Sequence, residues 1–299
     1  MLDEYLWGAA SRISPEAPVA VVEVVRESAE LGGAANVAQN ISSLKGLPIL
    51  AGVVGRDSAG ERLKRILEEK GIATDGVFVE EDRPTTVKTR IMAQHQHILR
   101  VDKESKSPIS DETKRKVVEF VSEGLENADA LLFEDYDKGV LDGGIIGELV
   151  GLAKSQGKVV TADPKFDHFF EYRGVDLFKP NQREVEAVMG VRLTNGQSAS
   201  RVGRQLVSKL GDPSVLLTQG EKGMVLFLPE GEETHIAAVA REVFDVSGAG
   251  DTVIAAATLA LAAGASPREA AVIANSAAGI GVSRVGVVPV DFEELWEAI

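Results

Sequence analysis

An aspartate follows a glycine-rich turn at the start of a long run of small and apolar residues. The turn is Gly248-Ala249-Gly250, the aspartate is Asp251, and residues 252–263 are nearly all helix formers. The first amides of a helix lack intrahelical partners and its dipole makes that end positive, so this turn can bind an anion. A carboxylate beside it suits removing a proton from a hydroxyl while a phosphoryl group arrives. By itself the motif is equally consistent with Asp251 as a helix cap.

Two motifs combine strand ends with turns that could face a nucleotide. Asn181 and Glu184, in NQRE, form either a capping box or a pair that organises magnesium, through water, beside phosphates. Thr218, Gly220 and Gly223, in TQGEKG, form either a plain turn or a backbone surface against which a nucleotide lies.

Other polar residues are candidates for binding a sugar. Gly32 and Gly33 offer bare backbone and Asn36 an amide for hydroxyl groups, although a packing role fits as well. Two strand ends carry acids and lysines that suit hydroxyl and phosphate contacts, and ordinary loops share this composition. These residues are Asp135, Lys138, Asp163 and Lys165.

Composition excludes several classes of function. The 299 residues carry a net charge of −14, which argues against nucleic acid or an anionic membrane as a partner. There are no cysteines, hence no disulfide or thiolate metal site, and only four histidines. The start of the chain has no secretory signal pattern, and no apolar run is long enough to span a bilayer, so a cytoplasmic location is expected. The GxxxxGK[ST] and GxGxxG motifs are absent, so phosphate binding is assigned to residues 248–251.

Strand and helix patterns alternate along most of the chain and predict an α/β fold with a mainly parallel central sheet covered by helices on both faces. We expect ligands at the carboxyl ends of the strands. The expected strands are 48–55, 74–79, 130–135, 158–163, 176–180 and 214–219, with hairpin-like strands in 223–239. The expected helices are 31–46, 56–71, 111–127, 142–156, 181–189, 198–210, 251–263, 266–282 and a short one from Asp291.

One region departs from this alternation. Residues 85–102 suit two consecutive antiparallel strands with a turn near residues 94–96, and residues 19–25 are rich in β-branched side chains. Together these segments predict a small sheet, with strands at about 17–26 and 84–103, that stands off the main body.

With these motifs in order, almost the whole chain resembles the ribokinase-like (PfkB) carbohydrate kinases. DVSGAGD is similar to their catalytic signature and LGGAANVAQNISSLKG to their amino-terminal sugar-binding signature. Within the family, the likeness is closest to the kinases of ADP-heptose synthesis for lipopolysaccharide. It rests on SRISPEAPVAVVEV, TTVKTRIMAQHQHILRVD, DYDKG, ADPK, KPNQRE and ANSAAG.

The resemblance implies ATP-dependent phosphorylation of the anomeric hydroxyl of D-glycero-β-D-manno-heptose 7-phosphate, with Mg²⁺ and, in some members, a monovalent cation such as K⁺. Asp251 would be the base, and Gly248, Ala249 and Gly250 the anion hole. The implied nucleotide and magnesium residues are Asn181, Glu184 (through water), Thr218, Gly220, Gly223 and Asn275. The implied sugar residues are Asp3, Gly32, Gly33 and Asn36, with Asp135 and Asp163 nearby. Lys88, Arg90 and Arg100 are the candidates for the substrate's phosphate, with Lys138 and Lys165 as competitors.

The resemblance also implies one kinase domain over residues 1–299, with the stand-off sheet as a lid that doubles as a homodimer interface. Two departures qualify it. The family has a first strand of the central sheet ahead of the segment similar to MLDEYLWG, and its fused members carry a nucleotidyltransferase half for which this sequence has no room. A kinase for another sugar or sugar phosphate, and a catalytically idle binding protein, are the alternatives.

Overall fold

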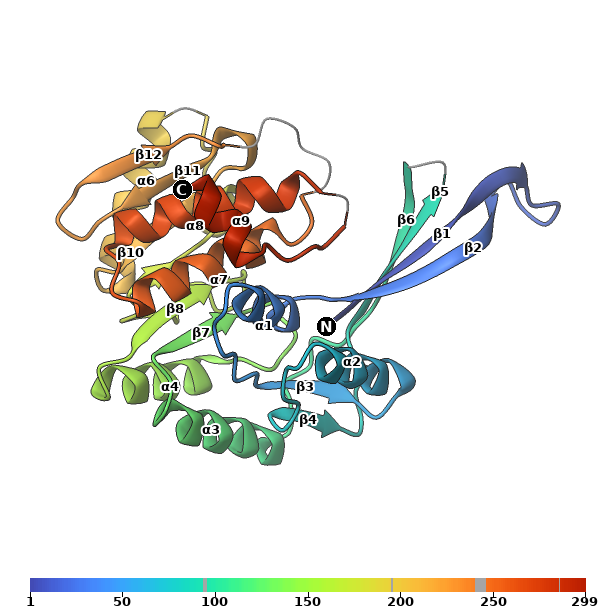
Figure 1. The fold of residues 1–299 in the computed structure, drawn as a ribbon, viewed down its shortest axis with the longest axis horizontal. Coiled ribbons are helices and arrows are strands. Elements are labelled where there is room, and N and C mark those ends of the chain that lie inside the picture. Colours follow the sequence, from blue (N-terminus) through green and yellow to red (C-terminus); the bar gives the residue numbers. More distant parts are fainter. Residues whose placement is uncertain (94–95, 195, 240–245, 285) are drawn as a thin grey trace.

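The computed structural model describes residues 1–93, 96–194, 196–239, 246–284 and 286–299. Its centre is a six-stranded sheet of order β12-β11-β10-β9-β8-β7 (Figure 1). The strands β7, β8, β9 and β10 pair in parallel, and β11 and β12 extend the sheet by antiparallel pairing. The strands are β7 Ala130–Glu134, β8 Val159–Asp163, β9 Leu177–Phe178, β10 Ser214–Thr218, β11 Met224–Phe227 and β12 Glu233–Ile236.

Helices cover both faces of this sheet because alternate strand residues point to opposite sides. In β10, Val215 and Leu217 pack with one apolar cluster and Leu216 with the other. The first cluster contains residues of α3 Asp111–Leu125, α4 Gly143–Ser155, α5 Gln182–Met189 and α6 Gly196–Leu210. The second contains residues of α1 Ala34–Ser43, α7 Ala249–Ala262, α8 Pro267–Val282 and α9 Phe292–Ala298. The predicted fold class is confirmed.

The second sheet has only two strands, β3 Gly52–Gly55 and β4 Val77–Glu80, which pair in parallel. The sequence predicted longer strands, 48–55 and 74–79, as part of the main alternation. The prediction was wrong in length, because residues 47–51 are not in a strand and Leu47 and Ile49 are exposed. The helix α2 Ser58–Glu69 begins where predicted, since the Asp57 carboxylate accepts a hydrogen bond from the amide of Gly60.

The third sheet projects from the body as two long arms and has the order β2-β1-β5-β6 (Figure 1). Its strands are β1 Leu2–Ile13, β2 Ala20–Leu31, β5 Val87–Ala93 and β6 Gln96–Lys103. We call this sheet the lid. The pattern predicted β2, β5 and β6 but not β1, which pairs antiparallel with β2 and parallel with β5. Residues 94–95 of the predicted turn lie outside the described residues.

The lid therefore differs from the body in how its strands are covered. Its core residues near the body, such as Leu2 and Leu31, are buried, whereas Ile13, Val25 and Leu99 farther along are exposed. Within the described ranges, none of the helices has the length and apolar character needed to cross a membrane.

Candidate active site

Asp251 lies in the first turn of α7, directly after the glycine turn. Gly248 adopts a left-handed conformation (φ 76°), and a Cβ there would lie 2.9 Å from the side-chain nitrogen of Asn36. The turn thus needs glycine both for its backbone angle and for the approach of Asn36. Asn36 Nδ2 donates to Asp251 Oδ2 at 2.7 Å, and the Tyr136 hydroxyl donates to Oδ1 at 3.2 Å. Both carboxylate oxygens are therefore oriented by neutral donors.

The environment of Asp251 makes it a stronger base than an exposed aspartate. Its side chain is buried, and this burial raises its pKa to about 6. The hydrogen bond from Asn36 opposes the increase, whereas the negative charge of Asp163 adds to it. Burial and the neighbouring carboxylates raise the pKa of Tyr136 well above its usual value, so its hydroxyl remains a donor. A carboxylate that is ionised at neutral pH and still basic suits general-base catalysis.

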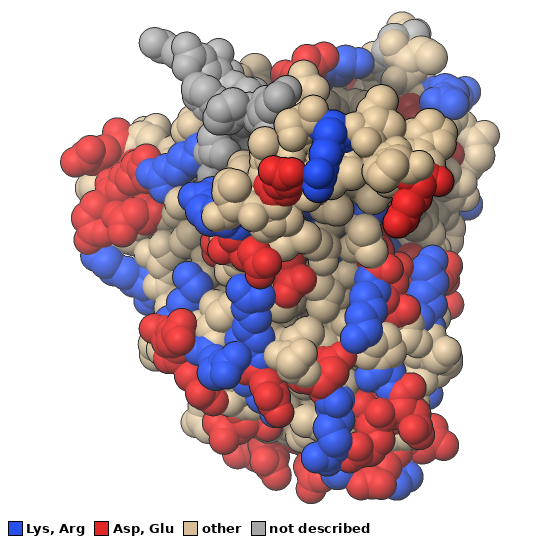
Figure 2. All heavy atoms as spheres, turned by 90° about the vertical axis from the view of Figure 1, so that its right-hand side faces the viewer, with Lys and Arg blue, Asp and Glu red and all other residues tan. Residues whose placement is uncertain are grey.

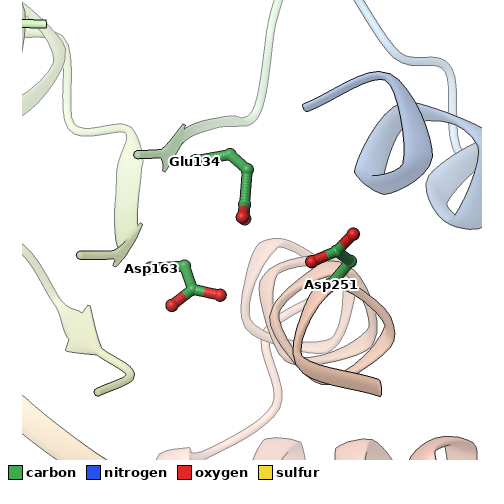
Figure 3. Close-up of side chains that lie close together, drawn as sticks. All are labelled: Glu134, Asp163 and Asp251. Atoms are coloured by element: carbon green, nitrogen blue, oxygen red, sulfur yellow. The ribbon is translucent and has the colours of Figure 1, made fainter. Parts of the chain in front are cut away.

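Two further carboxyl groups face Asp251, as Figure 3 shows. Glu134 and Asp163 end the neighbouring strands β7 and β8, where they are register partners, and one oxygen of each of the three acids lies within 4.8 Å of the others. Lys179, after β9, is buried and forms a 2.7 Å ion pair with Asp163. The two Glu134 oxygens are buried and have no hydrogen-bond partner among the described residues.

This cluster fits a divalent cation such as Mg²⁺. Its donors are all carboxylate oxygens, which Mg²⁺ prefers, and the unpartnered oxygens of Glu134 are buried polar groups that need a proton or a cation. In the free protein, burial and the charges of Asp163 and Asp251 raise the pKa of Glu134 well above its usual value, so it holds a proton. A cation would replace that proton.

Asn181 and Glu184 form a genuine capping box at the start of α5. Asn181 Oδ1 accepts from the amide of Glu184 at 3.0 Å, and Glu184 Oε2 accepts from the amide of Asn181 at 2.9 Å. The other Glu184 oxygen accepts from Lys165 at 2.6 Å. Burial would lower the pKa of Lys165, but the charges of Asp163 and Glu184 outweigh it and raise the pKa. The structure thus shows the capping role, and the magnesium role stays a prediction.

The residues predicted to face the nucleotide come partly together. Asn181 and Thr218 form a β-bridge, which brings the NQRE and TQGEKG motifs side by side. Gly220 (φ 61°) and Gly223 (φ 84°) both adopt left-handed angles that favour glycine. Asn275, on α8, donates its side-chain amide to the carbonyl of Ala237 at 2.8 Å. Its predicted contact with ATP stays a prediction.

A cavity of about 440 Å³ opens beside Asp251 and reaches the lid. Asp3 on β1 and Arg90 on β5 form a 3.0 Å ion pair at its wall. A Cβ on Gly32 would lie 2.8 Å from Asp3, and one on Gly33 3.3 Å from the ring of Tyr136, so both glycines allow close packing here. The cavity is lined by Met1, Asp3, Asn36, Lys88, Arg90, Arg100, Lys106, Tyr136, Asp137, Lys138, Lys165, Phe166, Ser247, Gly248, Asp251 and Val287.

The lid thus brings its three predicted cations, Lys88, Arg90 and Arg100, to the cavity that contains Asp251. Lys138 and Lys165, the competitors, line it too.

Asp135 is placed differently. Its carboxylate accepts from the Tyr172 hydroxyl at 2.7 Å and from the Asp137 amide at 2.9 Å, so it holds the loop in shape. Its predicted contact with substrate stays a prediction.

Sequence reasoning missed several residues of the site. Glu134 and Lys179 each lie at the end of a strand. Glu134 directly precedes Asp135, and Lys179 lies two positions before Asn181, so each is close to a residue that the sequence did predict. A charged residue at the end of an apolar strand was the available signal. Three further residues of the cavity wall had no such signal in the sequence, because aromatic and basic residues are common in loops. They are Lys106, Tyr136 and Phe166.

Comparison with known proteins identifies the family of the chain. Residues 5–293 match the family described as pfkB family carbohydrate kinase. The chain is 44% identical over 295 residues to the bifunctional protein HldE of Desulfatibacillum aliphaticivorans, covering 99% of this chain and 60% of that protein. It is also 44% identical over 299 residues to HldE of Pelobacter propionicus, covering 61% of it. The chain therefore spans about 60% of the length of these relatives.

Solved structures share the fold. Arabidopsis thaliana ribokinase complexed with ribose and ATP superposes with a TM-score of 0.78 at 23% identity, covering 99% of this chain and 95% of that one. Phosphofructokinase-2 from Escherichia coli, in complex with potassium, gives 0.81 at 20% identity, covering 99% and 94%.

Proposed function

Because this chain belongs to the pfkB family of carbohydrate kinases, and is thus an ATP-dependent sugar kinase, we propose that its substrate is D-glycero-β-D-manno-heptose 7-phosphate. The γ-phosphoryl group of ATP goes to the anomeric hydroxyl, giving the 1,7-bisphosphate, a precursor of ADP-heptose and the lipopolysaccharide core. The observation that carries this proposal is a cavity lined both by buried Asp251 and by the lid cations Lys88, Arg90 and Arg100. The similarity to proteins named HldE supports the choice of sugar.

In this mechanism Asp251 accepts the proton of the anomeric hydroxyl as its oxygen bonds to the γ-phosphorus. The bond from that phosphorus to the bridging oxygen of ADP breaks, and ADP leaves with the electron pair. Asn36 and Tyr136 hold the Asp251 carboxylate for this transfer through their hydrogen bonds. Positioning and charge stabilisation supply most of the acceleration, because a loose transition state needs little covalent help.

The phosphoryl group is bound by the start of α7. The amides after Gly248 and the helix dipole favour its negative charge. Gly250 lies close to buried Lys179, since a Cβ there would be 3.4 Å from its ammonium nitrogen. Lys179 and Lys165, each paired with a carboxylate, add positive charge nearby.

Glu134 and Asp163 would hold Mg²⁺, with Glu184 contributing through water. When bound, the ion neutralises charge on the phosphates of ATP. A monovalent cation such as K⁺ is a further part of the proposal that rests on the family alone.

The remaining assignments follow from the same proposal. Residues 1–299 form one kinase domain, and the lid makes the homodimer interface. Exposed apolar side chains on the lid support this role, because such groups gather at protein interfaces. They are Ile13, Val19, Val24, Val25, Ile98, Leu99 and Val101. An enzyme that consumes ATP and a soluble sugar phosphate would act in the cytoplasm.

The test is to incubate the chain with ATP, Mg²⁺ and a panel of sugars and sugar phosphates that includes both heptose anomers. ADP release and phosphorus NMR of the products identify the acceptor. A new anomeric phosphate on the β-heptose 7-phosphate is expected. Turnover of another sugar at a higher kcat/KM would reject the assigned substrate.

A further inference from the structure

A buried hydrogen-bond network connects Asp251 to two polar residues that do not line the cavity, Asn40 on α1 and Thr252 on α7. Asn36, which does line the cavity, lies between them and the carboxylate. We call Asn36, Asn40 and Thr252 the amide network; their exposed fractions are 1%, 1% and 4%. Acidic and basic side chains are interspersed over the molecular face in Figure 2, whereas the members of this buried network are all neutral.

The hydrogen bonds of the amide network run in one direction. The Thr252 hydroxyl donates to Asn40 Oδ1 at 3.2 Å, and Asn40 Nδ2 donates to Asn36 Oδ1 at 3.2 Å. Asn36 Nδ2 then donates to Asp251 Oδ2 at 2.7 Å. A side-chain amide has one accepting end and one donating end, so each bond restricts the orientation of the next amide. The side chains behind Asn36 therefore determine which end of its amide faces Asp251.

A backbone carbonyl fixes the direction of the network. Asn40 Nδ2 also donates to the main-chain oxygen of Asn36 at 2.9 Å. That oxygen can only accept, so the Asn40 amide must present its nitrogen to Asn36 and its oxygen to Thr252. The second hydrogen of Asn40 Nδ2 is then available for Asn36 Oδ1. Because these bonds do not involve Asp251, they hold the Asn36 amide in the same way before and after the carboxylate accepts a proton.

We propose that Asn40 and Thr252 are positioning residues of the kinase, which fix the Asn36 amide with its nitrogen toward Asp251. A flipped Asn36 would place its oxygen against a carboxylate oxygen, and two buried acceptors in contact lose a hydrogen bond and repel each other. This inference rests on the proposed function only in taking Asp251 as the base, and the identity of the sugar does not enter it. Asn36 transmits the effect, since it contacts Asp251 and lines the cavity.

The first test is steady-state kinetics with the sugar that the parent phosphorylates best. Asn40→Leu keeps the branched shape of the side chain but removes both hydrogen bonds to Asn36, while the Thr252 hydroxyl keeps the Gly248 carbonyl as its acceptor. kcat should fall by roughly 10- to 100-fold, because small displacements near the reacting atoms are costly. KM for the sugar should rise, since Asn36 lines the cavity, whereas KM for ATP should not change. A fraction of inactive protein would change neither KM.

Thr252 offers a milder variant and its rescue. Thr252→Val removes the hydroxyl and should lower kcat by roughly two- to tenfold, the worth of one neutral hydrogen bond. Thr252→Ser keeps the hydroxyl and should stay close to the parent.

Thr258→Val is the matched control on the same helix. Thr258 is also 4% exposed, and its hydroxyl likewise donates to the carbonyl four residues earlier, that of Ile254. Its side-chain partner is Thr161 on β8, which is outside the amide network. The control should lose stability as Thr252→Val does but keep the kcat and both KM values of the parent.

The second test measures the orientation of Asn36 without any substrate, from the side-chain amide signals of protein labelled with ¹⁵N-asparagine. The Asn36 signal is identified by its absence from Asn36→Ser. The proton that Asn36 donates to the Asp251 carboxylate is in a charge-assisted hydrogen bond and should resonate downfield. Asn40→Leu should move this signal upfield, whereas Thr258→Val should leave it in place.

The inference is overturned by an unmoved Asn36 signal or parent kinetics in Asn40→Leu, or by a Thr252→Ser variant as slow as Thr252→Val. These outcomes are separate from those of the proposed function. If the parent phosphorylates another sugar best, the assigned substrate is rejected, and the variants compared on that sugar still decide the positioning role. If heptose 7-phosphate is the best substrate and Asn40→Leu has parent kinetics, the positioning role alone is lost.

Discussion

The carboxyl cluster at the α7 end of the site and the cations on the lid side of the cavity differ in charge and in exposure. At the α7 end, Glu134, Asp163 and Asp251 crowd together with buried Lys179, in a site where desolvation dominates the pKa values. At the lid end, half-exposed Arg100 and exposed Lys106 keep their charge in contact with water. The difference indicates a division of roles. In the proposed mechanism, groups with perturbed acidity carry the chemistry, and the lid cations bind the substrate.

The largest effect on activity is expected from a substitution of Asp251. Asp251→Asn removes the base while keeping the side-chain shape, so kcat should fall by about 10²- to 10⁴-fold. ATP binding, measured by calorimetry, should stay within a few-fold, because the anion site is backbone. Near-normal turnover in this variant would assign the proton transfer to another group.

A substitution of Lys179 tests how strongly the stability of the fold depends on the buried cation beside Asp163. Lys179→Met leaves Asp163 as an unpaired buried charge, and loss of one partner of such a pair costs about 3–5 kcal/mol. Urea unfolding should show this loss. The control is Lys116→Met, which breaks a surface ion pair with Glu112 and should cost under about 0.5 kcal/mol. Similar losses of unfolding free energy in both variants would show that the buried ion pair contributes no more to stability than the surface pair.

Glu134 gives a prediction with a defined direction in pH. Its pKa in the folded protein is raised, so the folded state holds a proton that the unfolded chain releases near pH 4.5. The parent should therefore lose stability from this group as pH rises above 4.5 toward the raised value, whereas Glu134→Gln should not. Measured without metal or nucleotide, the free energy of unfolding of the variant should gain on that of the parent as pH rises above 4.5. A constant difference would mean that Glu134 is ionised in the fold.

The smallest effect is expected at Tyr136. Activity should fall as pH drops below about 6, where Asp251 becomes protonated. Tyr136→Phe removes a hydrogen bond that lowers the pKa of Asp251, so the acid limb of kcat/KM should move to higher pH. The loss at pH 6 should be roughly two- to tenfold, with little change at pH 8. If the acid limb does not move, the 3.2 Å hydrogen bond from Tyr136 does not influence the pKa of Asp251.

Local patterns were sufficient to predict much of this architecture. The glycine turn before α7 is encoded by adjacent residues, and the alternating strands and helices follow from apolar periodicity. The capping box of α5 could likewise be read from Asn181 and Glu184. Their spacing alone could not separate capping from magnesium binding, because one geometry permits both.

Features that depend on distant pairing could not be predicted in this way. β1 is a strand because β2 and β5 flank it, and β5 is more than 70 residues away in the chain. The ion pair of Lys179 depends on Asp163, which is 16 residues away in the chain. The charge on the lid side of the cavity likewise depends on which carboxylates contact Lys88, Arg100 and Lys138. Composition indicated an acidic protein without showing that several cations gather along the wall of one cavity.

A steady-state comparison of Asp251→Asn and Lys88→Met, with heptose 7-phosphate as the varied substrate, shows whether catalysis and substrate binding are divided between these two parts of the site. Asp251→Asn should lower kcat with little change in KM, whereas Lys88→Met should raise KM by roughly tenfold with kcat nearly kept. The opposite pattern, or equal loss of kcat in both variants, would contradict a division between a catalytic end and a binding end.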